Sequence, residues 1–233
     1  MGLNRSKGNM YSWISHTHTH LGGECPHKCS YCYVNNLRFG RPEKYQGPIW
    51  LIGKELNVKY GKGKTIFIEN CNDLFAEGIK YNLIRSILNH CTEWPDNTYV
   101  FQTKNPERAK FWTDCLRLLP DHIIMGTTIE TNRDTYPMSL APSPAARALF
   151  FKQIEGDDLK KFVTIEPIMN FDVDQLSEMV IGIKPSFVNI GADSKGNNLP
   201  EPPYFKVKAL IKNIKSAGID VKEKSNLKRL KEE

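Results

Sequence analysis

Short apolar runs rich in β-branched and aromatic residues alternate along the chain with longer segments of helical periodicity. This alternation is typical of repeated β-α units, which build a parallel sheet. The runs that we expect as strands are Tyr11–Ser15, Thr65–Glu69, Thr98–Thr103, Ile123–Ile129, Phe162–Glu166, Phe187–Ile190 and, most weakly, Ile219–Lys222.

Helix signals lie between the expected strands. Asn105 and Ser143 each stand before a proline, and a polar cap followed by proline at the first helical position favours a helix start. A glycine that follows an apolar periodic run, such as Gly218, favours a helix end. The expected helices run from Pro106 to before Pro120, over Ala145–Ile154, from Asp172 or Asp174 to near Gly182, and over Tyr204–Ala217.

The number of β-α units decides between a closed and an open barrel. The expected strands give about six or seven units, fewer than a closed eight-stranded barrel requires. We therefore expect an α/β fold, a partial and open TIM-type barrel of about (β/α)6 with a parallel sheet. It should form a single domain over residues 1–233, with a basic tail over residues 224–233.

Composition narrows the class of protein. The chain is 40% hydrophobic and 25% charged, as in an ordinary globular domain. No apolar run reaches the roughly 18 residues of a membrane span, and the N-terminus lacks the apolar stretch of a signal peptide, so we expect a cytoplasmic protein without a membrane partner. The formal net charge is +6, and Lys206–Lys231 is rich in lysine. Such a stretch permits DNA contact, although it is more often a solvated helix face.

Three of the six cysteines, Cys25, Cys29 and Cys32, lie in one short loop with the spacing CxxxCxxC, directly after the first expected strand. Without a secretory signal, clustered thiols indicate metal or cofactor ligands rather than disulfides. Three thiolates can hold a four-iron four-sulfur (4Fe–4S) cluster and leave one iron open. An open coordination site is a mark of reactivity. The spacing therefore predicts a reactive iron–sulfur site.

A non-catalytic zinc-binding module is the rival interpretation of this loop. Zinc would require a fourth ligand, which His27 or a nearby histidine could supply. Three such histidines, His16, His18 and His20, alternate with threonines. An extended strand would place all three on one side, beside a substrate, the cluster or a second metal, whereas a loop leading into the cysteines would not. Zinc sites more often use CxxC pairs, so the spacing favours the cluster.

The loop closely resembles the signature of the radical S-adenosylmethionine (SAM) superfamily, CxxxCxΦC, with Tyr31 at the aromatic position Φ. Membership implies that SAM binds the open iron through its amino and carboxylate groups. It also implies that one electron, from a donor such as flavodoxin or ferredoxin, cleaves SAM to methionine and a 5′-deoxyadenosyl radical, which abstracts hydrogen from a substrate. The chemistry would make the protein an enzyme whose reaction type stays open.

The segments TKNPER, TTIETN and VTIEPI are similar to those of a radical SAM group of phages and bacteria that is distantly related to spore photoproduct lyase. By analogy of fold, this resemblance implies a pyrimidine-derived substrate, such as a modified thymidine in DNA that undergoes a phage hypermodification-type rearrangement. A small metabolite is the alternative substrate.

The superfamily places SAM across the carboxyl ends of the strands, so polar residues at those ends are the expected ligands. Where the family carries a GGE-like element for the SAM amino group, this chain has Glu69 and Asn70 without the glycines. Thr128 and Glu130 are expected at the ribose hydroxyls. The full set expected to bind the cofactor is Glu69, Asn70, Thr103, Thr128, Glu130 and Asn189.

Two residues are candidates for catalysis. Cys71 could donate a hydrogen atom to a product radical, as a cysteine does in the lyase, or could be a small buried core residue. Glu166, fixed by the following proline, would be costly to bury without a partner and is expected at SAM or substrate. Asp73 could bind there or cap the next helix, and Arg147 could equally be a surface charge. Cys91 and Cys115 are expected in the core.

Overall fold

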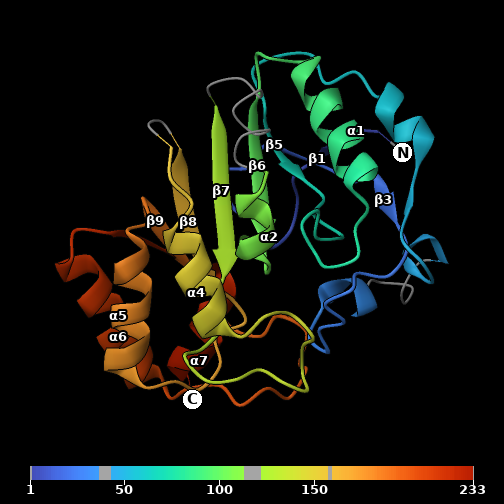
Figure 1. Cartoon of the computed structure of the whole chain (residues 1–233). Coiled ribbons are helices and arrows are strands. Elements are labelled where there is room, and N and C mark those ends of the chain that lie inside the picture. Colours follow the sequence, from blue (N-terminus) through green and yellow to red (C-terminus); the bar gives the residue numbers. More distant parts are fainter. Residues whose placement is uncertain (1, 37–42, 113–121, 157–158, 233) are drawn as a thin grey trace.

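The computed structural model describes residues 2–36, 43–112, 122–156 and 159–232. One eight-stranded sheet dominates it, in the order β1-β2-β5-β6-β7-β8-β9-β10 (Figure 1). From β2 to β10 all neighbouring strands are parallel, and β1 is antiparallel to β2. The strands are β1 Asn4–Arg5, β2 His16–His18, β5 Thr65–Ile68, β6 Thr98–Thr103, β7 Ile123–Thr128, β8 Lys160–Ile165, β9 Phe187–Ile190 and β10 Asp220–Glu223.

Helices cover one face of this sheet, and β3 (Leu21–Gly22) and β4 (Trp50–Leu51) form a separate two-stranded sheet. In Figure 1 the helices α1, α2 and α4 lie across the strands β5 to β8. The described helices are α1 Tyr81–Thr92, α2 Pro106–Lys110, α4 Pro144–Lys152, α5 Val173–Ile183, α6 Tyr204–Ser216 and α7 Arg229–Glu232, with 3-10 helices η1 Tyr33–Asn36, η2 Glu43–Tyr45, η3 Gly53–Asn57 and η4 Ser225–Lys228.

Alternation along each strand divides the apolar residues between two cores. Successive side chains of a strand point to opposite faces. Ile66 of β5 and Val188 of β9 belong to the large core beneath the helices, whereas Phe67 and Phe162 belong to a smaller core on the inner face. The register is therefore fixed on both faces, because a one-residue slip would exchange the two sets.

The segment Tyr11–Ser15 is not a strand, contrary to the sequence prediction. Tyr11 and Trp13 stack at 5.5 Å between ring centroids, and Trp13 contacts Phe162 and Phe187 edge-on at 5.3 and 5.2 Å. These large side chains fill the inside of the open sheet, which a regular strand at the sheet edge could not do. The strand begins only at His16.

The remaining elements follow the predicted rhythm closely, and the predicted open α/β architecture is confirmed. In the described part of the chain, no pairing joins β1 to β10, so the sheet stays open. Asn105 and Ser143 cap α2 and α4 by accepting hydrogen bonds from the backbone N–H of Arg108 and Ala146. The helix α5 ends at Ile183, near Gly182 as predicted, and Lys184 follows it with a φ of 55°.

Two helix predictions differ in outcome from the rest. The predicted continuation of the helix from Pro106 towards Pro120, with Cys115, lies outside the described residues. Asp172 precedes α5 but does not cap it, because its carboxylate instead binds the Arg133 guanidinium at 3.1 Å. Among the described helices, none is long and apolar enough to cross a membrane.

Candidate functional site

A cavity of about 570 Å³ opens at the carboxyl ends of the parallel strands. Ligands of parallel β-α folds bind at this end of the sheet. Most of the predicted site residues line the cavity. They are Cys25, Cys29, Cys32, Glu69, Asn70, Cys71, Thr103, Thr128 and Glu166. Glu130 and Asn189, which were expected with them, are absent from the lining.

The cysteine loop approaches the neighbouring backbone very closely. Gly23 has a φ of 89°, and a Cβ there would lie 2.2 Å from the carbonyl oxygen of Pro48. Only glycine tolerates both conditions. Farther along, the backbone N–H of Ser30 donates to the carbonyl of Met138 at 2.8 Å, and the N–H of Cys32 to that of Cys29 at 3.0 Å. Backbone contacts thus fix the loop on both sides.

His27 lines the same cavity as the three cysteines, and its imidazole is bound to Asp73. Its Nε2 lies 2.8 Å from Oδ2 of Asp73, and both side chains are buried. Asp73 also accepts from the Thr103 hydroxyl at 3.0 Å and from the backbone N–H of Lys104 at 2.7 Å. Burial opposes ionisation of Asp73, but His27 and these donors hold its pKa below the usual range. Asp73 is therefore an internal anchor between the cysteine loop and β6, not a cap of α1.

The donor set fits an iron–sulfur cluster better than zinc. Cys29 is buried and Cys25 and Cys32 are half-buried, and all three line one cavity. Within the described ranges, no three His, Cys, Asp or Glu side chains lie close enough together to bind a single metal ion. Three thiols around a cavity suit a cubane, which is wider than one ion and needs no fourth protein ligand. His27, the nearest candidate fourth ligand for zinc, is committed to Asp73.

Two donors reach the sulfur of Cys29. The Ser139 hydroxyl lies 3.1 Å and the Lys104 Nζ 3.4 Å from Cys29 Sγ. Neither contact was predicted. Ser139 stands in a proline-rich stretch that indicates only a loop, and a lone lysine after a strand carries no signal by itself.

Glu69 lines the cavity, but its carboxylate is bound by the segment before the cysteine loop. Its Oε1 accepts from the backbone N–H of His20 at 2.7 Å and lies 2.7 Å from His20 Nδ1, and its Oε2 accepts from the N–H of Leu21 at 3.2 Å. The adjacent Asn70 accepts from the Thr19 hydroxyl at 2.8 Å and donates to Tyr33 Oη at 3.1 Å. Glu69 thus clamps the segment that leads into the cysteine loop.

Cys71 is half-buried and lines the cavity, so it is not a closed core residue. Its Sγ lies 3.4 Å from Tyr33 Oη and 3.5 Å from Asn70 Nδ2. Across the cavity, Thr128 Oγ1 accepts from Gln102 Nε2 at 2.8 Å. A thiol that follows β5 and a hydroxyl at the end of β7 thus line the same cavity.

Glu166 is tied to three partners. Its Oε2 lies 2.6 Å from Lys224 Nζ, and its Oε1 accepts from Asn9 and Asn226 at 2.9 Å each. A Cβ on Gly191 would lie 2.8 Å from the Glu166 carboxyl carbon, so glycine makes room for it. This carboxylate joins the N-terminal and C-terminal segments at the rim of the cavity.

Glu130 does not face the cavity, so the predicted ribose contact is wrong on geometric grounds. It is fully buried, with Oε1 2.7 Å from Lys104 Nζ and 2.8 Å from Tyr31 Oη, and Oε2 2.8 Å from an Arg147 nitrogen. Burial opposes its ionisation, but Arg147 and Lys104 hold its pKa well below the usual range. Arg147 is itself fully buried, not a surface charge. Asn189 is buried outside the lining, and its amide nitrogen lacks a partner.

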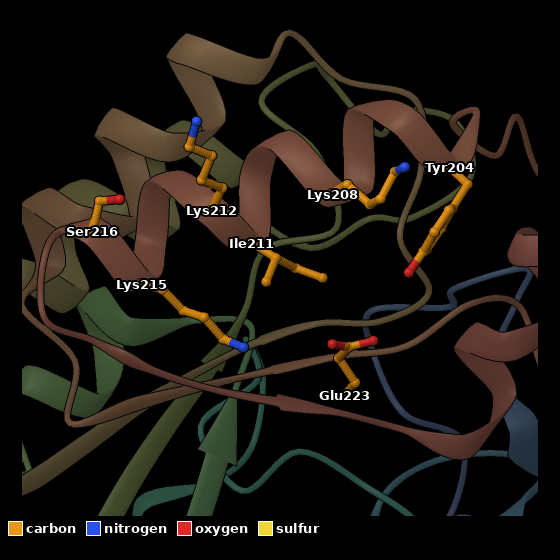
Figure 2. A pocket seen from close by; sticks show the side chains of 7 residues that line it. All are labelled: Tyr204, Lys208, Ile211, Lys212, Lys215, Ser216 and Glu223. Atoms are coloured by element: carbon orange, nitrogen blue, oxygen red, sulfur yellow. The ribbon is translucent and has the colours of Figure 1, made fainter.

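A second hollow lies between α6 and β10, away from the cysteines. Figure 2 shows Ile211, Lys215 and Tyr204 pointing into it beside Glu223, while Lys212 points outward. It contains none of the predicted site residues. This hollow is part of the lysine-rich surface that the sequence indicated.

The sequence matches the family described as "Protein of unknown function (DUF5131)" over residues 11–182. The chain belongs to this family. No curated protein matches the sequence.

Solved structures with the same fold include mutants of spore photoproduct lyase and the protein SuiB. A cysteine-to-serine mutant of spore photoproduct lyase has a TM-score of 0.63 at 11% identity, covering 95% of this chain and 80% of that chain. A double mutant of the lyase with bound AdoMet and dinucleoside spore photoproduct has a TM-score of 0.61 at 10% identity, covering 93% and 78%. Streptococcus suis SuiB, bound to precursor peptide SuiA, has a TM-score of 0.57 at 13% identity, covering 89% and 48%. At these identities the likeness shows the fold, and it confirms the fold that the resemblance implied.

Proposed function

We propose that this protein is a radical SAM enzyme that acts on a nucleobase. The observation that carries the proposal is the arrangement of Cys25, Cys29 and Cys32 around one cavity at the carboxyl ends of the parallel strands. Three thiols without a fourth protein ligand would hold a 4Fe–4S cluster and leave one iron open. When bound, the cluster and SAM would supply a 5′-deoxyadenosyl radical for hydrogen abstraction.

The chain's own residues would bind and orient the reactants. Asn70 and Thr128 offer an amide and a hydroxyl in the lining of the cavity, and we propose them as SAM contacts. Thr103 would support the site indirectly, because its hydroxyl donates a hydrogen bond to Asp73 at 3.0 Å. Cys71, exposed to the same cavity, is the proposed hydrogen donor to a product radical. Glu166 orients the rim against Lys224 rather than reacting.

Charge at the cavity rim supports an anionic substrate such as DNA. Arg5, Lys7 and Lys195 line the cavity and are exposed, and in the described part of the chain none has a carboxylate partner. Unpaired cations around an opening favour phosphate backbones. The cavity is small, so a base in duplex DNA would have to leave its stack to enter it. These features favour a modified pyrimidine in DNA over an uncharged small metabolite.

The first experiment is anaerobic reconstitution with iron and sulfide, followed by reduction in the presence of SAM. We expect a brown protein that releases 5′-deoxyadenosine, and the Cys29→Ala variant should release none. Cys91→Ala is the matched control, because Cys91 lies on the core-facing side of α1, outside the cavity, and should keep the activity. Zinc in place of iron in the purified protein would contradict the proposal.

DNA binding tests the substrate class separately. Removing a phosphate contact reduces the salt dependence of binding by about one unit of slope. We expect this reduction, with weaker binding, for Arg5→Gln and Lys7→Gln, and no comparable change for Lys212→Gln, which removes the same charge from the α6 surface (Figure 2). Binding that ignores salt would instead favour a small metabolite as substrate.

A further inference from the structure

A chain of buried charges ends at the cysteine loop. Arg147 and Glu130 are fully buried and lie 2.8 Å apart, and Glu130 lies 2.7 Å from Lys104. Lys104 in turn lies 3.4 Å from Cys29 Sγ. Lys104 follows β6, Glu130 follows β7 and Arg147 lies on α4. The fold, and not the local sequence, therefore brings the three charged residues together.

The charges in this chain do not balance. Two cations, Arg147 and Lys104, face a single carboxylate, that of Glu130. Lys104 is half-buried at the cavity, and a surplus charge that is largely removed from water is costly unless an opposite charge lies beside it. Asp73 is the other buried carboxylate near Lys104. It accepts a hydrogen bond from the backbone N–H of Lys104, not from the ammonium group, and it pairs with His27. The surplus positive charge of Lys104 therefore acts on the sulfur of Cys29.

The hydroxyl of Tyr31 ties this charge chain to the cysteine motif. It donates to Glu130 Oε1 at 2.8 Å and accepts from Lys104 Nζ at 3.0 Å. The Lys104 ammonium also lies 4.5 Å from the centroid of the Tyr31 ring. The aromatic residue of the motif thus fixes the ammonium at the sulfur of Cys29 as well as packing beside it.

We propose that Lys104 sets the reduction potential of the cluster by donating to Cys29 Sγ, and that Glu130 and Arg147 position it. This inference rests on the proposed function. Reduction adds one negative charge to an iron–sulfur cluster, and net charge and hydrogen bonds to the sulfurs set its potential. A fixed ammonium beside one ligand sulfur stabilises the reduced cluster. It makes the cluster easier to reduce by the electron donor.

The test is the midpoint potential of the reconstituted cluster, measured without SAM so that cofactor binding does not contribute. We expect Lys104→Met to shift the ratio of oxidised to reduced cluster about tenfold towards the oxidised form at a fixed potential, which corresponds to about 59 mV for one electron. Lys104→Arg keeps the charge and should restore most of the difference. Lys212→Met, the same charge change on the outer surface of α6, should leave the potential unchanged.

The sign of a second variant separates electrostatics from loosened structure. Glu130→Gln removes a negative charge and should raise the potential, opposite to Lys104→Met, whereas general loosening would move both variants in the same direction. A shared direction, or an unchanged potential in Lys104→Met, would overturn the inference alone. Failure of the wild-type protein to assemble any cluster would overturn the proposed function, and this inference with it.

Discussion

Glu69 and Glu130 follow two strands of the same sheet and were both expected to bind SAM, Glu69 at its amino group and Glu130 at its ribose, yet their surroundings differ. Glu69 accepts two backbone N–H groups and pairs with His20, which contacts His90 and Tyr60 at 3.0 Å on the helix-covered side. Glu130 is held between the cations Lys104 and Arg147, beside the cysteine loop.

A carboxylate at the end of a strand is therefore not a cofactor ligand because of its position alone. Its role depends on which groups the neighbouring elements place within reach. Glu69 meets backbone and imidazole and becomes a clamp on the segment before the cysteines. Glu130 meets two cations and becomes their counter-ion. Both carboxylates are already bound by groups of the chain itself.

The largest expected effect comes from Glu130→Gln. Removing the carboxylate leaves the buried Arg147 and the half-buried Lys104 without their counter-ion, and breaking a buried ion pair in this way costs about 3–5 kcal/mol. Urea unfolding of the cluster-free protein measures the change in the free energy of unfolding. A loss as small as that of an exposed pair would show that water reaches Glu130.

Glu69→Gln should cost less, about 1–3 kcal/mol. The amide still accepts one backbone hydrogen bond but leaves a second buried partner unsatisfied and ends the pairing with His20. The same urea measurement checks it. A loss as large as that of Glu130→Gln would erase the distinction drawn between a clamp and a counter-ion.

The histidine cluster beside Glu69 predicts a pH dependence of stability. Burial, then His20 and His90, lower the pKa of His18 to about 3. Below its unfolded value of about 6.5, the unfolded chain binds a proton that the folded chain does not, so stability falls as the pH falls. Between pH 6.5 and 5 this residue should account for a loss of about 1.5 kcal/mol.

The control for this prediction is His18→Phe, which packs a ring in the same place without a titrating group. Unfolding measured at both pH values should show a smaller loss than in the wild-type protein. An identical pH dependence in the two proteins would place the titration elsewhere, for example at His16, whose pKa is also lowered by burial.

The smallest effect is expected for Asp172→Asn. This carboxylate pairs with Arg133 on the surface, where both side chains are about half exposed. Exposed ion pairs contribute little, because water screens them and two side chains must be ordered. The melting temperature should therefore stay within experimental error. A clear decrease would show that position 172 supports the start of α5 by more than its ion pair.

Much of the fold was predictable, because its signals are local. The strands β6 and β9 have the predicted bounds, and Ser143 caps α4 as a polar residue before proline suggests. Alternating side chains and capping residues act over a few positions. Tyr11–Ser15 was misjudged for the opposite reason, since the aromatic partners that draw Tyr11 and Trp13 inside lie on distant strands.

The sequence by itself determined the cysteine loop and the end of the sheet at which it meets other polar residues. Only the tertiary structure decided which of those residues face the cavity. The contacts of Glu130 with Tyr31 and of Asp73 with His27 join positions far apart in the chain. Whether a buried carboxylate is a ligand, a clamp or a counter-ion depends on the charges that packing brings beside it, because a buried charge must be compensated by its neighbours.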